Sequence, residues 1–310
     1  MGNTTLLVNN MFGGTIPQGK TLLVACDAKY YVEHFVPLAY SAVGAGEQIH
    51  AHVVNPDRGC HGISMVLEED IGVTYSFERT DLSGIDSRTY YACARFMILP
   101  ELMAHGLSEA LVLDADCLVM NEIDWSQFRD ADVGLFFREP LANTGEWETQ
   151  GSKIAAGAVY VNKGAREFTQ DVRQNIAKGP FQWFIDQRAL NEAHDKHKDK
   201  LEFYGIPSNF MDWEFVEGST IWTGKGDRKH KNVTYVQAKE AWGSYFHGAS
   251  ACHSSIFVAR IGFCLLSETK QSSSDIKFGM PSLLSPIRIC SRLNFSGLSV
   301  RRNLSCDGDH

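Results

Sequence analysis

Two aspartates separated by one alanine, Asp114 and Asp116, have the types and spacing that favour metal chemistry. They directly follow the apolar run at 110–113, which predicts a buried strand in a sheet covered on both faces. Carboxylates at the end of such a strand are costly to bury without a partner, and Mg²⁺ and Mn²⁺ prefer oxygen ligands. We therefore predict a divalent metal site there, since open α/β sheets bind ligands at the carboxyl ends of their strands. The alternative is a strand followed by an acidic turn.

A second pattern raises a different chemistry. The segment from Gly14 to Thr21 fits the phosphate-binding pattern G-x-x-x-x-G-K-[ST], with Lys20 as its lysine. A P-loop requires a helix that begins at the lysine, so that backbone N–H groups cradle the phosphates. Residues 21–26 are instead typical of a strand, and Pro17 fits a plain turn. Because residues 111–114 also resemble a Walker B strand, a P-loop NTPase or kinase stays open as the alternative function.

Strands and helices alternate along the chain with short connections, which predicts an α/β fold with a mostly parallel sheet flanked by helices. The expected strands cover residues 21–26, 49–54, 73–77, 110–113, 133–137, 155–162 and 233–237. The expected helices cover residues 30–45, 63–70, 88–103, 164–177 and 183–195. Pro100 is expected to kink or break its helix. The polar segment 138–153 is long enough for an active-site loop.

Composition narrows the class of protein. The 310 residues carry a formal net charge of −8, which argues against a nucleic-acid partner. No apolar run reaches the roughly 20 residues that span a bilayer. Residues 1–20 lack a basic start followed by an apolar core, and the eight cysteines form no C-x-x-C pair, so we expect a reduced, cytoplasmic protein. Residues 1–250 are expected to form the domain, and the Ser-rich segment 251–310 an atypical add-on or partly disordered tail.

Six short segments in the same order resemble the GT-A glycosyltransferases, in particular the glycogenin-like family eight. The segments lie at 24–30, 95–102, 111–116, 157–162, 186–191 and 247–248. In that order they are similar to the family's first strand, its Arg-x-x-x-x-Pro helix, its Asp-x-Asp metal motif, its Gly-Val-x-x-x-Asn strand, its Asp-Gln helix and its His-containing motif. The resemblance therefore implies a Rossmann-like GT-A sheet over residues 21–250.

The resemblance also implies an activity. It implies a sugar transfer from a nucleoside diphosphate sugar, UDP-sugar by analogy with the family, to an unspecified glycan, protein or small-molecule acceptor, with retention of anomeric configuration. The implied metal is Mn²⁺ or Mg²⁺, held by Asp114, Asp116 and His247. The implied nucleotide contacts are Ala25, Asp27, Tyr30, Arg95, Asp114 and Ala115. Asp186 or Gln187 is implied near the reacting carbon.

Alternatives stand beside these roles. Arg95 fits a structural ion pair, and Asp186 fits a helix cap. Ala155 and Lys29 replace polar residues that are usual in the family, and the family's diphosphate-binding lysine is missing after the His247 motif. Lys225, in the basic loop 222–231, is the candidate replacement. A catalytically inactive sugar-nucleotide binding module is a further possible function.

Overall fold

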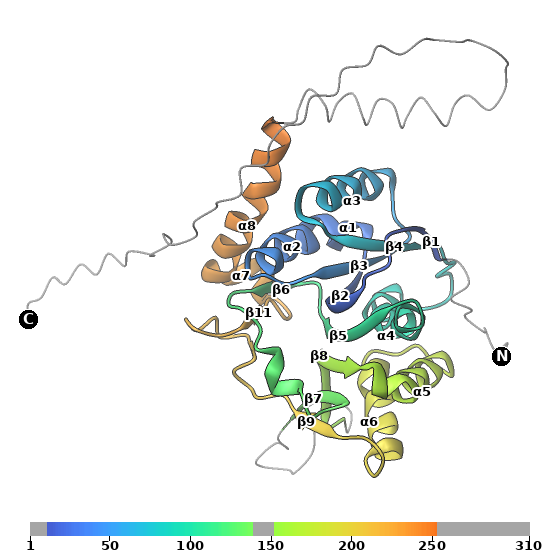
Figure 1. Cartoon of the computed structure of the whole chain (residues 1–310). Coiled ribbons are helices and arrows are strands. Elements are labelled where there is room, and N and C mark those ends of the chain that lie inside the picture. Colours follow the sequence, from blue (N-terminus) through green and yellow to red (C-terminus); the bar gives the residue numbers. More distant parts are fainter. Residues whose placement is uncertain (1–10, 139–151, 253–310) are drawn as a thin grey trace, which may run out of the picture. The chain divides into compact units, whose positions relative to one another are not determined.

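The computed structural model describes residues 11–138 and 152–252, with side chains described at 14–138 and 152–246. Its centre is an eight-stranded sheet in the order β1-β4-β3-β2-β5-β8-β7-β9 (Figure 1). Neighbouring strands in the row β4-β3-β2-β5 run parallel. The bounds of these strands are β2 (Gly19–Asp27), β3 (Ile49–Val54), β4 (Thr74–Glu78) and β5 (Leu107–Leu113). The predicted α/β fold with its mostly parallel sheet is confirmed.

The remaining strands extend this sheet and add a smaller one. Strand β8 is antiparallel to both β5 and β7, β7 is parallel to β9, and β1 is antiparallel to β4. Their bounds are β1 (Met11–Gly14), β7 (Val133–Phe137), β8 (Ile154–Asn162) and β9 (Phe203–Gly205). A three-stranded sheet contains β6 (Cys117–Val119), β10 (Met211–Asp212) and β11 (Ile221–Thr223).

Helices cover both faces of the central sheet (Figure 1). Along β2, Leu22 and Val24 join the core beneath α2 and α3, whereas Leu23 and Ala25 join the core beneath α4, α5 and α6. These alternating side chains are all buried, as expected for a strand covered on both faces. The helix bounds are α2 (Val36–Gly44), α3 (Arg58–Ile71), α4 (Ser87–Ala104), α5 (Arg166–Ala177) and α6 (Ile185–His197).

The structure rules out two possibilities left open by the sequence, a P-loop and a helix break at Pro100, and shows that one expected strand is wrong. Lys20 lies inside strand β2 instead of at the start of a helix, so Gly14–Thr21 lacks the geometry of a P-loop and the NTPase alternative loses its basis. Helix α4 continues through Pro100 without ending there. The expected strand at 233–237 is the start of helix α8 (Val233–Cys252).

Helix α8 follows from side-chain spacing rather than from strand propensity. Tyr235, Ala238 and Trp242 recur at intervals of three and four residues and pack on the cluster formed by β6 and β11. Helix α8 also packs along α2, where a Cβ added at Gly44 would lie 2.9 Å from the Trp242 ring. Tertiary packing therefore overrides the β-branched residues at the start of this segment.

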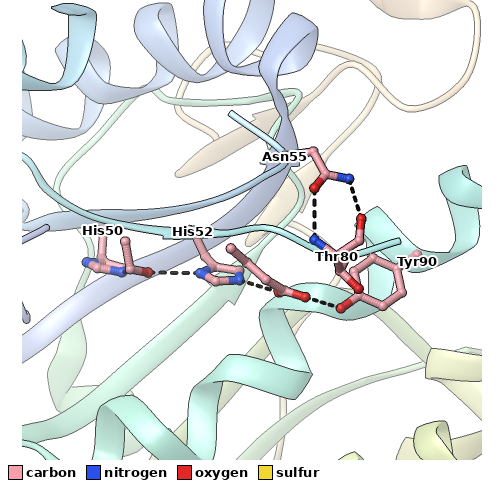
Figure 2. Close-up of polar contacts among 7 residues, drawn as sticks. His50, His52, Asn55, Thr80 and Tyr90 are labelled. Carbon is pink, nitrogen blue, oxygen red and sulfur yellow. Dashed lines mark hydrogen bonds and ion pairs between the residues drawn. The ribbon is translucent and has the colours of Figure 1, made fainter. Parts of the chain in front are cut away.

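Buried polar side chains link β3 and β4 to α4 (Figure 2). His50 Nε2 and His52 Nδ1 lie 3.0 and 2.9 Å from Ser76 Oγ. His52 Nε2 lies 2.9 Å from one carboxylate oxygen of Glu78, and the Tyr90 hydroxyl donates to the other. All five side chains are at most 2% exposed. Since water does not reach these groups, they satisfy one another's hydrogen bonds.

Acid is expected to destabilise this fold partly through His50. Burial, with a smaller contribution from His52, lowers the pKa of His50 from 6.5 to about 3. Below pH 6.5 the unfolded chain therefore binds a proton that the folded chain does not, and the free energy of unfolding falls as the pH drops toward 3. We expect His50→Gln to make this fall shallower by up to about 1.4 kcal/mol per pH unit. Urea unfolding at several pH values measures both slopes, and equal slopes would contradict the expectation.

Candidate active site

The candidate site lies between the adjacent strands β2 and β5, where the strand order reverses its direction across the sheet. From β2 the sheet continues through β3 and β4 on one side, and from β5 through β8 and β7 on the other. Asp27 ends β2 and Asp114 directly follows β5, its parallel neighbour, so both carboxylates lie at the same edge of the sheet. Such a switch point is where open α/β sheets bind ligands.

Arg95 of α4 joins two of the predicted site residues. Its guanidinium Nη1 donates to Asp114 Oδ1 at 2.5 Å, and its Nη2 lies 3.6 Å from Asp186 Oδ2. Nη2 also donates to the Ala156 carbonyl at 3.1 Å. Burial raises the pKa of Asp186, while Arg95 lowers it. The guanidinium is therefore the buried cation that compensates two carboxylates from different elements.

Asp186 and Gln187 lie together in the first turn of α6 and are both buried. The backbone N–H of Gln187 donates to Asp186 Oδ1 at 2.8 Å. Asp186 does not cap this helix, because the N-cap position is Phe184, which makes no side-chain cap hydrogen bond. The carboxylate is instead directed to the Arg95 guanidinium.

Asp116 pairs with a cation that the sequence did not single out. Lys229, in the short helix α7 (Arg228–Lys231), places its Nζ 2.8 Å from Asp116 Oδ2. The segments before and after α7 are held at the same residue. Gly224 N–H and the Tyr235 hydroxyl donate to the Asp116 carbonyl at 2.7 and 2.8 Å. Burial lowers the pKa of Lys229, but Asp116 and Tyr30 together raise it above its ordinary value. Lys225 is exposed, so Lys229 is the lysine of this loop that reaches the aspartates.

The residues predicted to contact a nucleotide lie at the turn after β2. Asp27 Oδ1 accepts a hydrogen bond from Tyr30 N–H at 2.7 Å and so caps helix α1 (Ala28–Tyr30). The Tyr30 ring is half-buried, and Lys229 Nζ lies 5.0 Å from its centroid. Ala25 and Ala115 are buried beside this turn and beside the aspartates, respectively. The single side chain of Lys229 thus lies against both Asp116 and the Tyr30 ring.

His34 is a buried residue of this region that sequence reasoning missed. It lies in the π-helical turn η1 (Tyr31–Phe35), and its ring centroid is 4.6 Å from that of Tyr30. Neither ring nitrogen has a hydrogen-bond partner among the described residues. Burial, followed by the charge of Lys239, lowers its pKa to about 3, so the imidazole is neutral at pH 7. No sequence pattern around His34 indicates a functional role, because only its burial in the folded structure distinguishes this residue.

The two aspartates fit a divalent cation in donor type. Each uses one carboxylate oxygen in its ion pair, and carboxylate oxygens are the preferred ligands of Mg²⁺ and Mn²⁺. Within the described part of the chain, no cluster of three or more His, Cys, Asp or Glu residues forms a metal site. The side chain of His247, the predicted third ligand, lies outside the described side chains, as do the expected loop at 139–151 and the tail from 253.

The mostly parallel sheet flanked by helices is consistent with a Rossmann-like GT-A fold. The structure is similar to that of the galactosyltransferase LgtC in complex with donor and acceptor sugar analogs, with a TM-score of 0.51 and 16% sequence identity. The match covers 73% of this chain and 96% of that one. A further match is the glycosyltransferase GlyE of Streptococcus pneumoniae, at TM-score 0.48 and 13% identity, over 76% of this chain and 64% of that one.

Sequence comparison adds no closer relative. No protein-family model matches the chain, and no curated protein does. The likeness to the galactosyltransferase structure therefore supports the fold alone. In the described ranges, no helix is both long and apolar enough to cross a bilayer.

Proposed function

We propose that this chain is a metal-dependent glycosyltransferase. It moves a sugar from a nucleoside diphosphate sugar, in the first instance a UDP-sugar, to a glycan, protein or small-molecule acceptor with retention of configuration. The observation that supports this function is the pairing of Asp114 and Asp116 with Arg95 and Lys229 at the switch point of a glycosyltransferase fold. The aspartates suit a divalent ion that binds the diphosphate of the donor. The arginine and lysine suit the negative charge of that diphosphate.

Asp114 and Asp116 would hold the divalent ion, Mn²⁺ or Mg²⁺, with His247 as the proposed third ligand. When bound, such an ion supplies positive charge to the departing diphosphate. Lys229 supplies a second positive charge from the protein itself, in the role first considered for Lys225. Arg95 positions Asp114, because its guanidinium is buried and hydrogen-bonded to that carboxylate.

The remaining predicted residues divide between the two halves of the donor. Asp27 and the Tyr30 ring are proposed to contact the base, by hydrogen bonding and stacking, with Ala25 and Ala115 providing close backbone approach. Arg95 and Asp114 are proposed to lie between the base and the sugar. Asp186 and Gln187, which the Arg95 guanidinium joins to Asp114, are proposed near the reacting carbon of the sugar.

A thermal-shift screen of nucleotide sugars with and without Mn²⁺ tests this function. A donor that raises Tm only with the metal, and that is hydrolysed or transferred, supports the transferase. Stabilisation without turnover over a panel of acceptors would support the inactive binding module instead. Absence of a shift with every nucleotide sugar would contradict both.

The four cysteines in the described ranges are free and buried, which supports the proposed reducing, cytoplasmic location.

Lys229 provides a sharper test of the donor site. Lys229→Gln is expected to raise KM for the nucleotide sugar roughly 10- to 100-fold, because a charge-assisted hydrogen bond to a phosphate is lost. Lys225→Gln removes the same charge from an exposed position of the same loop and is expected to change KM less than about twofold. Steady-state kinetics on both variants measures the difference. Equal effects would show that Lys229 acts only through the net charge of the loop.

A further inference from the structure

A cavity of about 460 Å³ lies at the ends of the same strands that face away from the aspartates. Lys20, near the start of β2, is in register with Glu109, near the start of β5. Glu109 is in turn in register with Asn162 at the end of β8. Asp114 lies beyond the opposite end of β5, roughly 17 Å of extended chain away. The cavity is therefore separate from the candidate active site.

Three cations from different parts of the chain lie in the walls of this cavity. Lys20, Arg129 and Lys163 line it, and all three are exposed. None of them forms an ion pair with a carboxylate among the described residues. They come from three separate elements: β2, the segment after the 3-10 turn η2 (Trp125–Phe128), and the turn η3 (Lys163–Ala165). The fold thus brings three positive charges to one concave surface, where Glu109 is the one carboxylate of the lining.

Two other polar side chains of the cavity already make hydrogen bonds within the protein. Glu109 accepts a hydrogen bond from the Tyr160 hydroxyl at 3.0 Å. The Asn162 amide donates to the Ala131 carbonyl at 2.9 Å, and its oxygen accepts from Gly164 N–H at 2.7 Å. Three cations face one carboxylate in the lining, so the cavity carries excess positive charge, which favours an anion.

An aromatic wall completes the cavity. The Trp125 indole N–H donates to Glu47 at 2.9 Å, and the ring packs edge-on against Phe128 and Tyr160, so the indole is held in place. Lys20 Nζ lies 5.8 Å from the Trp125 ring centroid. A fixed indole beside a cation offers both an apolar face for a ring and a charge for a phosphate.

We propose that this cavity is a second ligand site that binds a small organic phosphate, with the phosphate among Lys20, Arg129 and Lys163 and the organic ring toward Trp125. Its volume falls within the range of about 300–1,000 Å³ typical of small-molecule sites. Sugar phosphates and nucleoside monophosphates share this chemistry. The site does not depend on the glycosyltransferase function proposed above, because it uses none of the same residues.

Calorimetric titration of the full chain tests the site, with glucose 1-phosphate, uridine monophosphate, inorganic phosphate and glucose as separate probes. We expect saturable binding of at least one organic phosphate, weakened at least tenfold in Lys20→Gln/Arg129→Gln. The charge-matched control Lys178→Gln/Lys200→Gln replaces two exposed lysines outside the cavity and is expected to bind as the wild type does. Circular dichroism of each variant verifies the fold.

A third variant distinguishes the two sites. Asp114→Asn/Asp116→Asn is expected to retain binding of the organic phosphate. Loss of binding in that variant, with binding intact in Lys20→Gln/Arg129→Gln, would assign the ligand to the active site and overturn the proposal. Absence of saturable binding to the wild type would also overturn it. Inorganic phosphate or glucose binding as tightly as the organic phosphates would contradict the ring contact with Trp125.

Discussion

Asp116→Asn is expected to lower kcat/KM for sugar transfer by at least about 100-fold while the protein stays folded. The substitution keeps the shape of the side chain but removes the charge that is proposed to hold the divalent ion and that pairs with Lys229 at 2.8 Å. Electrostatic groups at such sites contribute several kcal/mol, and each tenfold in rate corresponds to about 1.4 kcal/mol. Asp114→Asn should give a loss of the same order, since the second carboxylate stands on the same metal motif.

The measurement is release of the nucleoside diphosphate from the donor identified in the thermal-shift screen, at several Mn²⁺ concentrations. Asp130→Asn, at an exposed aspartate away from the site, is the matched control and is expected to keep wild-type activity. If Asp116→Asn retained activity within about threefold of wild type, the aspartate would not be part of the metal site, and the proposed mechanism would be wrong.

His52→Leu is expected to lower the free energy of unfolding by about 3 kcal/mol or more. The reason is the buried network of Figure 2: without His52, the Glu78 carboxylate loses a hydrogen-bond partner at 2.9 Å in a place that water does not reach. For a folded region of this size, that loss corresponds to a decrease in Tm of roughly 6–12 °C. Chemical denaturation and thermal melting measure both quantities.

Two further variants test whether the loss of stability comes from the buried network or from replacing any histidine. His105→Leu replaces an exposed histidine and is expected to change stability by no more than about 0.5 kcal/mol. The double variant His52→Leu/Glu78→Leu removes both partners and should recover part of the loss, because no buried carboxylate is left without its imidazole partner. A single variant as stable as the wild type would show that Glu78 is compensated without His52.

The residues behind these two predictions differ in how far the sequence alone identifies them. The Asp-x-Asp pair was identified from four apolar residues and two carboxylates, all adjacent in the chain. The histidine network was not identified, because His50 and His52 in sequence are only two polar residues in a predicted strand. Their partners Ser76 and Glu78 belong to the neighbouring strand β4, and the register between β3 and β4 places them opposite.

The same distinction applies to the candidate site. The order of strands and helices and the position of Asp114 after a buried strand were predictable, since they depend on residue periodicity within a few positions. The expected helix at 30–45 was found as α1, η1 and α2 in succession, with the buried His34 in the π-helical turn. Helix α8 was misread as a strand, because its packing residues meet β6 and β11, which the local sequence does not reveal.

The sequence by itself determined the α/β class, the buried strand before Asp114 and the Asp-x-Asp pair that follows it. Only the tertiary structure decided which cations meet them: Arg95 between Asp114 and Asp186, and Lys229, from 113 residues further along the chain, on Asp116. It also gathered three cations into a cavity at the far ends of the strands. The physical reason is that periodicity specifies which face a side chain occupies, whereas strand register and helix packing specify which side chains meet across that face.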